Sequence, residues 1–154
     1  GTDHLTRLVL SQHGVVVTPC PKLQELEWRG KTLSEKTPCR ISDVTTLTGV
    51  TIVAKDPIDS HFLFPLSLES LCLTVWDHPI ESRLVTPLTR LQRLNINVNN
   101  DEDPLDLSGM TALTKLDAHG SRVTHLPTAL VECTVALRSD TDLSHLTTLT
   151  SLHV

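Results

Sequence analysis

The side chains that proteins use most often for catalysis and metal binding are present in this chain but scattered along it. There are eight histidines and four cysteines, yet no HExxH motif, no close Cys/His pair, no GxSxG turn and no glycine-rich phosphate loop. Such motifs matter because they bring a nucleophile, its base and an orienting group, or several metal ligands, within reach of one another. The sequence therefore predicts no enzyme, no metal site and no cofactor.

Two further groups of ligand-forming or reactive residues agree with that prediction. The acidic run at residues 99–103 lacks the alternating ligands and the glycine of an EF-hand loop, so we expect a solvated turn there. The four cysteines show no paired spacing, and the chain has no Asn-x-Ser/Thr sequon. Both features favour a reducing compartment such as the cytoplasm, although they leave the localisation open.

The charge and hydropathy of the chain exclude two classes of partner. The formal net charge is -5, the pI is about 5.9, and no run of basic residues occurs. A nucleic acid or an anionic membrane surface needs a clustered positive patch, so neither is expected to bind. The longest apolar runs are far shorter than the roughly 20 residues that cross a bilayer, so we expect no membrane insertion of this segment.

Leucine organises the sequence, since it supplies 27 of the 154 residues. Hexads with apolar residues at their first, fourth and sixth positions recur every 17 to 24 residues. They begin at Leu5, Leu23, Leu47, Leu68, Leu91, Leu113, Leu130 and Leu149. Competing hexads at Leu63 and Leu126 would leave coils of 16 and 13 residues, shorter than such repeats allow, and we reject both.

The segments that precede the hexads fall into two types. Four segments share apolar residues at five positions, Ser or Thr at the second position and Thr at the fifth: residues 41–52, 85–96, 107–118 and 143–154. In three others a proline comes two or three residues before the first leucine, which forces an extended or turn entry. The chain therefore mixes two kinds of coil.

A hexad of this pattern is a short strand whose inward side chains fill one layer of core, and neighbouring coils stack these strands into a parallel sheet. The return segments of about a dozen residues are too short for helices of average length. We therefore predict one solenoid domain, residues 1–154, with about eight short parallel strands on a concave face and a convex side of extended chain, turns and 3-10 helix with little α-helix. Because neither end has a polar cap, we expect a fragment of a longer chain.

At these hexads the sequence resembles the leucine-rich-repeat superfamily, and the four Ser/Thr coils are most similar to the short, roughly 22-residue repeats of internalin-like proteins. The resemblance implies an α/β-type leucine-rich-repeat solenoid, or horseshoe, that binds a protein ligand on its concave sheet and needs no cofactor. The chain departs from the family at the ninth repeat position, where only Asn99 supplies the usual asparagine. The other equivalent residues are His13, Lys31, Lys55, Trp76, Ser121 and Arg138. We therefore expect no continuous asparagine ladder.

The outward positions of the hexads predict three columns across the concave face. The third-position column is Arg7, Glu25, Gly49, Ser70, Arg93, Lys115, Glu132 and Ser151. The fifth-position column is Val9, Glu27, Thr51, Cys72, Asn95, Asp117, Thr134 and His153. The seventh-position column is Ser11, Arg29, Val53, Thr74, Asn97, His119 and Ala136.

The candidate ligand-binding residues lie where long polar side chains from adjacent coils converge. They are Arg93, Asn95, Asn97, Lys115, Asp117 and His119, with Glu27 and Arg29 as further candidates. The alternative is a solvated sheet face whose charges neutralise one another. Trp76 is a candidate interface residue, since tryptophan is enriched at such sites, or else a cap packed over the convex turn near Pro79. Trp28 occupies an inward position and is predicted to be core.

Three functions compete. The leading hypothesis is a module that binds a protein ligand on its concave sheet, in a receptor, adhesin or effector. The alternatives are a self-assembling segment that stacks through its uncapped ends, and a regulatory or sensor arm of a larger receptor, effector or enzyme.

Overall fold

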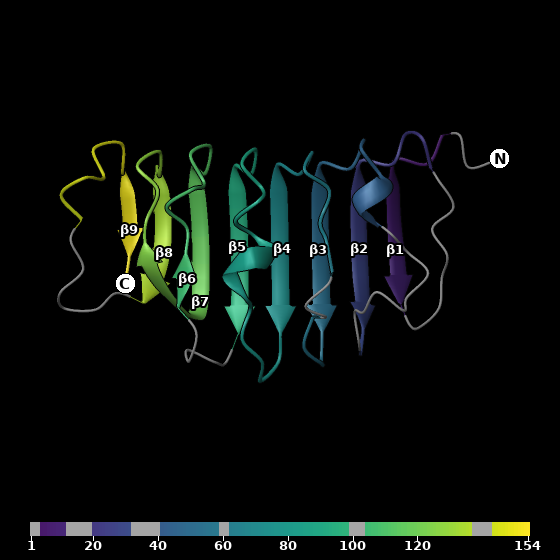
Figure 1. Cartoon of the computed structure of the whole chain (residues 1–154), viewed down its shortest axis with the longest axis horizontal. Helices are drawn as coiled ribbons and strands as arrows, with labels where there is room; N and C mark the ends of the chain where they lie inside the picture. Colours follow the sequence, from purple (N-terminus) through teal and green to yellow (C-terminus); the bar gives the residue numbers. More distant parts are fainter. Residues whose placement is uncertain (1–3, 12–19, 32–40, 59–61, 99–103, 137–142) are drawn as a thin grey trace.

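The computed structural model describes residues 4–11, 20–31, 41–58, 62–98, 104–136 and 143–154. In this part of the chain, eight strands form one parallel sheet in the order β1-β2-β3-β4-β5-β7-β8-β9 (Figure 1). The strands are β1 (Arg7–Ser11), β2 (Glu25–Gly30), β3 (Gly49–Ala54), β4 (Ser70–Val75), β5 (Arg93–Val98), β7 (Lys115–His125), β8 (Glu132–Ala136) and β9 (Ser151–His153). A short strand, β6 (Leu105–Asp106), pairs with β7 outside this order. The predicted parallel β-solenoid is confirmed.

The register of the sheet follows the leucine hexads. Each of the eight main strands begins at the third position of a hexad, so the third-position column is paired along the whole sheet, from Arg7 opposite Glu25 to Glu132 opposite Ser151. The fifth-position column is paired in the same way. Leu63 and Leu126 lie outside the strands, which confirms the rejection of hexads at both.

Hydrogen bonds between successive coils fix where each strand starts. At each step one carbonyl accepts two amide donors from the next coil; for example, Thr48 and Gly49 both donate to the Gln24 carbonyl at 2.9 Å. Hydroxyl groups just before the hexads add a second link. Thr46 donates to the Leu23 carbonyl at 2.7 Å and Ser67 to the Leu47 carbonyl at 2.6 Å. These bonds satisfy carbonyls that would otherwise lie between coils without a donor.

The ninth repeat positions form no asparagine ladder in the described part of the structure. At the ninth positions that the structure describes, the side chains of Lys31, Lys55 and Trp76 are exposed. None of the three occupies the buried place between coils that an asparagine would need. Asn99 lies outside the described residues, as does the acidic run at residues 99–103.

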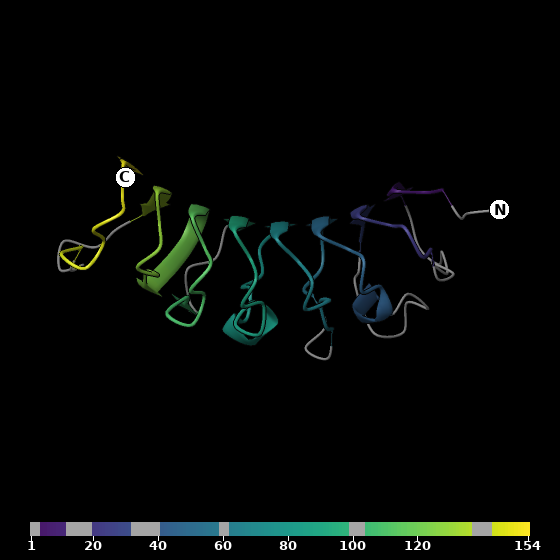
Figure 2. The same ribbon diagram turned by 90° about the horizontal axis from the view of Figure 1, so that it is seen from above.

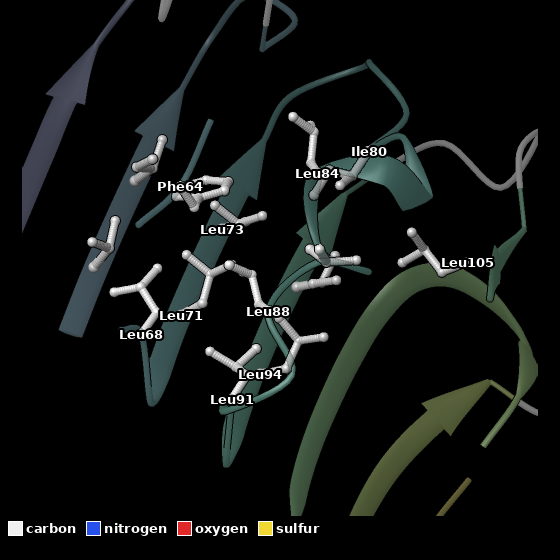
Figure 3. Packing of buried hydrophobic residues seen from close by; sticks show 14 of the residues in the cluster. Phe64, Leu68, Leu71, Leu73, Ile80, Leu84, Leu88, Leu91, Leu94 and Leu105 are labelled. Atoms are coloured by element: carbon white, nitrogen blue, oxygen red, sulfur yellow. The ribbon is translucent and has the colours of Figure 1, made fainter. Parts of the chain in front are cut away.

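The core is a stack of aliphatic layers between the sheet and the return segments. Figure 3 shows Leu68, Leu71 and Leu73 of one coil beside Leu91 and Leu94 of the next, all at most 2% exposed. Burying one such side chain contributes roughly 1.5–3 kcal/mol, so repeated layers supply most of the stability. Trp28 is 6% exposed, which confirms its prediction as a core residue.

The convex side is built from turns and two 3-10 helices, η1 (Ile41–Asp43) and η2 (Ser82–Leu84), as predicted. Within the described ranges there is no α-helix, and no helix long and apolar enough to cross a membrane. Figure 2 shows the strands along the inner side of a shallow arc and the return segments on its outer side. The outward columns of the hexads therefore face the hollow of the arc.

One coil departs from the predicted register. Strand β7 continues past the concave face, bends where Gly120 has a φ of 68°, and pairs Val123 with Leu105 of β6. Only 17 residues separate the hexads at Leu113 and Leu130, so the strand itself serves as the return segment. As a consequence Ala136 pairs with Arg122, and its predicted place beside His119 in the seventh-position column is wrong.

Candidate functional site

Two open hollows lie on the sheet face inside the arc. The larger, about 480 Å³, extends from β4 to β9 and is lined by polar side chains that include Asn95, Asp117 and Glu132. The smaller, about 330 Å³, extends from β1 to β5 and includes Glu25 and Glu27 in its wall. Both hollows are lined by Ser70 and Arg93, so they meet over β4 and β5.

Six of the predicted site residues lie together on β5 and β7. The pairing of these strands places Arg93 opposite Lys115, Asn95 opposite Asp117 and Asn97 opposite His119. All six side chains are exposed or half-buried. The predicted convergence of long polar side chains from adjacent coils is therefore present in the structure.

Asp117 is at the centre of this group. Its Oδ2 accepts a hydrogen bond from Asn95 Nδ2 at 3.2 Å. His119 Nε2 lies 2.9 Å from Asp117 Oδ1, but the contact lacks the direction of a hydrogen bond, and this shielded oxygen has no donor. Asp117 therefore contacts a side chain on each of the two strands, Asn95 on β5 and His119 on its own strand β7.

The basic residues on β5 and β7 differ in their partners. Lys115 Nζ lies 2.8 Å from Glu132 Oε1 on the neighbouring β8. Arg93 forms no side-chain hydrogen bond or ion pair with any described residue. It is exposed and belongs to the walls of both hollows. Arg93 thus has its donors free for a ligand.

Glu27 and Arg29 form a separate group on β2, three strands away from β5. Glu27 accepts from Arg29 Nε at 2.6 Å and from Arg7 Nη2 at 3.3 Å, and Arg7 also lies 3.6 Å from Glu25. The hydrogen bond from Arg29, followed by the charges of Arg29 and Arg7, holds the pKa of Glu27 below its ordinary value. The group neutralises itself within the protein.

Trp76 is not on a concave strand. It follows the last residue of β4, at the rim of the sheet, and its side chain is 50% exposed. The next residue, Asp77, has a φ of 57°, a left-handed conformation that turns the chain sharply towards Pro79. The indole is therefore available at the rim, apart from the six residues on β5 and β7.

Two of the cysteines, Cys72 on β4 and Cys133 on β8, lie in the sheet with opposite orientations. Cys72 points outward and is half-buried, whereas Cys133 points inward and is buried, as the hexad register predicts. Burial, with a smaller effect of the Asp117 charge, raises the pKa of Cys72 and raises that of Cys133 to about 11. Both thiols are therefore harder to ionise than an ordinary cysteine, and it is the thiolate that reacts. Cys39 lies outside the described residues.

Sequence reasoning left several lining residues out of the site. Ser70, Gly49 and Glu132 stand in the third-position column with Arg93 and Lys115, and they line the hollows beside them. The column itself was the signal that could have found them. The prediction favoured long polar and charged side chains, whereas Ser70 and Gly49 contribute to the hollows because their small side chains leave space.

In the described part of the chain, no group of three or more His, Cys, Asp or Glu side chains is placed to hold a metal ion. No protein-family model matches the chain, and a search of curated proteins finds no match either. The function must therefore be argued from the concave face itself.

Proposed function

We propose that the protein is an interaction module that binds a protein ligand on the concave face of its sheet. The observation that carries the proposal is the pairing of the outward columns along the main strands, which joins two polar hollows into one continuous surface. With strands about 4.8 Å apart, eight strands present a surface on the order of 35 Å long. That length suits a protein surface of standard interface size.

The form of the hollows favours a protein over a small molecule. Pockets for small ligands enclose most of the ligand and are lined mainly by apolar side chains. The hollows on this sheet are open, and their walls contain charged and amide side chains from many strands. A large partner that contacts many strands at once uses such a surface better than a small ligand does.

We further propose that the solenoid is of the leucine-rich-repeat type. Support comes from the strand geometry: the hexad leucines lie inward in successive layers, and every main strand starts at the same hexad position. The convex turns and 3-10 helices suit the short repeats that the sequence resembles. A ligand on the concave sheet is what this repeat type implies.

The test compares two double charge reversals of equal size. Arg93→Glu with Lys115→Glu alters the concave face, and Lys55→Glu with Arg83→Glu alters a turn and the convex η2. A partner isolated by affinity capture is purified, and its affinity for each variant is measured by calorimetry. The concave variant should lose affinity by roughly a hundredfold or more, since charge reversal at an interface centre is severe.

The control variant should bind like the unaltered protein, and both variants should melt within a few degrees of it because all four side chains are exposed. A concave variant that folds and keeps its affinity would show that the ligand binds elsewhere.

A further inference from the structure

The floor of the concave face on β3 and β4, next to the place where the two hollows meet, is free of charge and of long side chains. The outward positions of β3 and β4 are Gly49, Thr51, Val53, Ser70, Cys72 and Thr74. None is charged, and all six residues are half-buried. A Cβ added at Gly49 would meet nothing closer than Glu25 Cγ at 3.6 Å, so local packing does not require this glycine. The missing side chain leaves room for an extended segment of another protein.

Arg93 borders this floor without a partner for its charge. The other arginine and lysine side chains in the walls of the hollows are in ion pairs, Arg7 with Glu27 at 3.3 Å and Lys115 with Glu132 at 2.8 Å. Within the described residues Arg93 is the exception. The pairing of β5 with β7 also sets it directly opposite Lys115, and like charges in that position repel each other.

An anionic group over Arg93 would supply the missing counter-charge and offset the repulsion between Arg93 and Lys115. A guanidinium offers a planar pair of donors that matches the two oxygens of a carboxylate. Ser70, the neighbour of Arg93 on β4, adds a hydroxyl on the side of the uncharged floor. At the β1–β2 end of the face, the charges around Glu27 are all in ion pairs and offer no comparable free charge.

We propose that the bound protein presents an extended acidic segment, whose aspartate or glutamate carboxylate binds Arg93 while the neighbouring backbone lies over Gly49 and Ser70. This inference rests on the proposed function and names the chemistry of the partner. Small floor residues admit the segment, and Arg93 sets its register.

The experiment uses a phage-displayed library of random dodecapeptides selected on the folded protein. The best peptides are synthesised with each acidic residue in turn changed to its amide. Their affinities are then measured for the unaltered protein, for Arg93→Gln, for Arg83→Gln as a matched exposed arginine outside both hollows, for Gly49→Gln, which fills the floor, and for the double variant Lys55→Glu with Arg83→Glu. Circular dichroism melting checks that each variant folds.

The inference expects selected peptides rich in Asp and Glu. Arg93→Gln should weaken binding by roughly tenfold to a hundredfold, and Arg83→Gln should not. Changing one peptide carboxylate to its amide should have little further effect on Arg93→Gln, because both changes remove the same contact. Gly49→Gln should weaken binding by steric exclusion.

The other outcomes separate the two proposals. Two results overturn the acidic-segment inference but leave the concave face as the binding surface. In both, Gly49→Gln lowers the affinity of the selected peptides; in one the peptides lack an acidic residue, and in the other Arg93→Gln leaves their affinity unchanged. The proposed function is overturned as well if neither Arg93→Gln nor Gly49→Gln changes the affinity of the peptides and the double variant Lys55→Glu with Arg83→Glu lowers it. A selection that retains no peptide counts against both.

Discussion

Two regions of the concave face, the β1–β2 end and the middle at β5–β7, use their charges in opposite ways. At the β1–β2 end, Glu27 contacts Arg29 at 2.6 Å and Arg7 at 3.3 Å, so opposite charges are satisfied within the sheet. In the middle of the face, at β5–β7, Arg93 lies opposite the like-charged Lys115 and has no ion pair in the described structure. The first arrangement stabilises the sheet, whereas the second leaves interactions to be completed by a ligand.

The difference teaches which charges to examine on a solenoid face. Exposed ion pairs contribute little, because two side chains lose freedom to form a contact that water screens. A charge that lacks its counter-charge in the folded protein has more to gain from a ligand. The β5–β7 region is therefore the better candidate for binding a ligand, although the β1–β2 end also has several charged residues.

The largest effect on the comparison should come from the packing beneath the β1–β2 end. A Cβ at Gly30 would overlap the ring of the buried Trp28, which cannot move freely, whereas a Cβ at Gly109 would meet nothing within 4 Å. Gly30→Ala should lower the free energy of unfolding by roughly 1–3 kcal/mol. Gly109→Ala should leave it unchanged or raise it slightly. Urea denaturation of both variants checks this, and equal stabilities would contradict the packing described for β2.

A smaller effect should follow from removing the central carboxylate of the β1–β2 end. Because the folded state lowers the pKa of Glu27 below 4.5, its ionised form stabilises the protein above that pH, and this stabilisation disappears as the pH falls through the lowered pKa. Glu27→Gln should therefore melt at a lower temperature than the unaltered protein at pH 7. The gap should close in acid, and a gap independent of pH would show that the ion pairs do not stabilise the sheet.

The smallest effect on stability is expected from a substitution in the β5–β7 region. Arg93→Gln removes a side chain that has no ion pair in the described structure and relieves its repulsion with Lys115. The free energy of unfolding should stay within about 0.5 kcal/mol of the unaltered value, or rise. Chemical denaturation beside Glu27→Gln at pH 7 makes the comparison direct. If Arg93→Gln lowered the free energy of unfolding more than Glu27→Gln does, the β5–β7 region and not the β1–β2 end would be the one whose charges stabilise the sheet.

The register of the sheet could be predicted from the sequence because it depends on a strict periodicity. A leucine at the first hexad position sets which side chains point inward, and a slip by one residue would expose the whole layer. For this reason Arg93, Asn95 and Lys115 were placed correctly on neighbouring strands. Trp28 was assigned to the core on the same argument.

Other features depend on distances that the sequence does not encode. The bend of β7 at Gly120 follows from the length available for that return segment, and it moved Ala136 away from His119. The partners of individual charges depend on side-chain conformations across strands, so the free state of Arg93 could not be inferred. Nor could the hydrogen bond from the Thr46 hydroxyl to the carbonyl of Leu23, which links two successive coils.

The central claim is that the ligand contacts the concave face, and site-specific photocrosslinking tests it most directly. A benzophenone amino acid is placed at Asn97, exposed on β5, or at Thr86, exposed on the convex side beyond η2. After irradiation with the purified partner, mass spectrometry should find a covalent adduct for position 97 and none for position 86. An adduct for position 86 and none for position 97 would contradict the account.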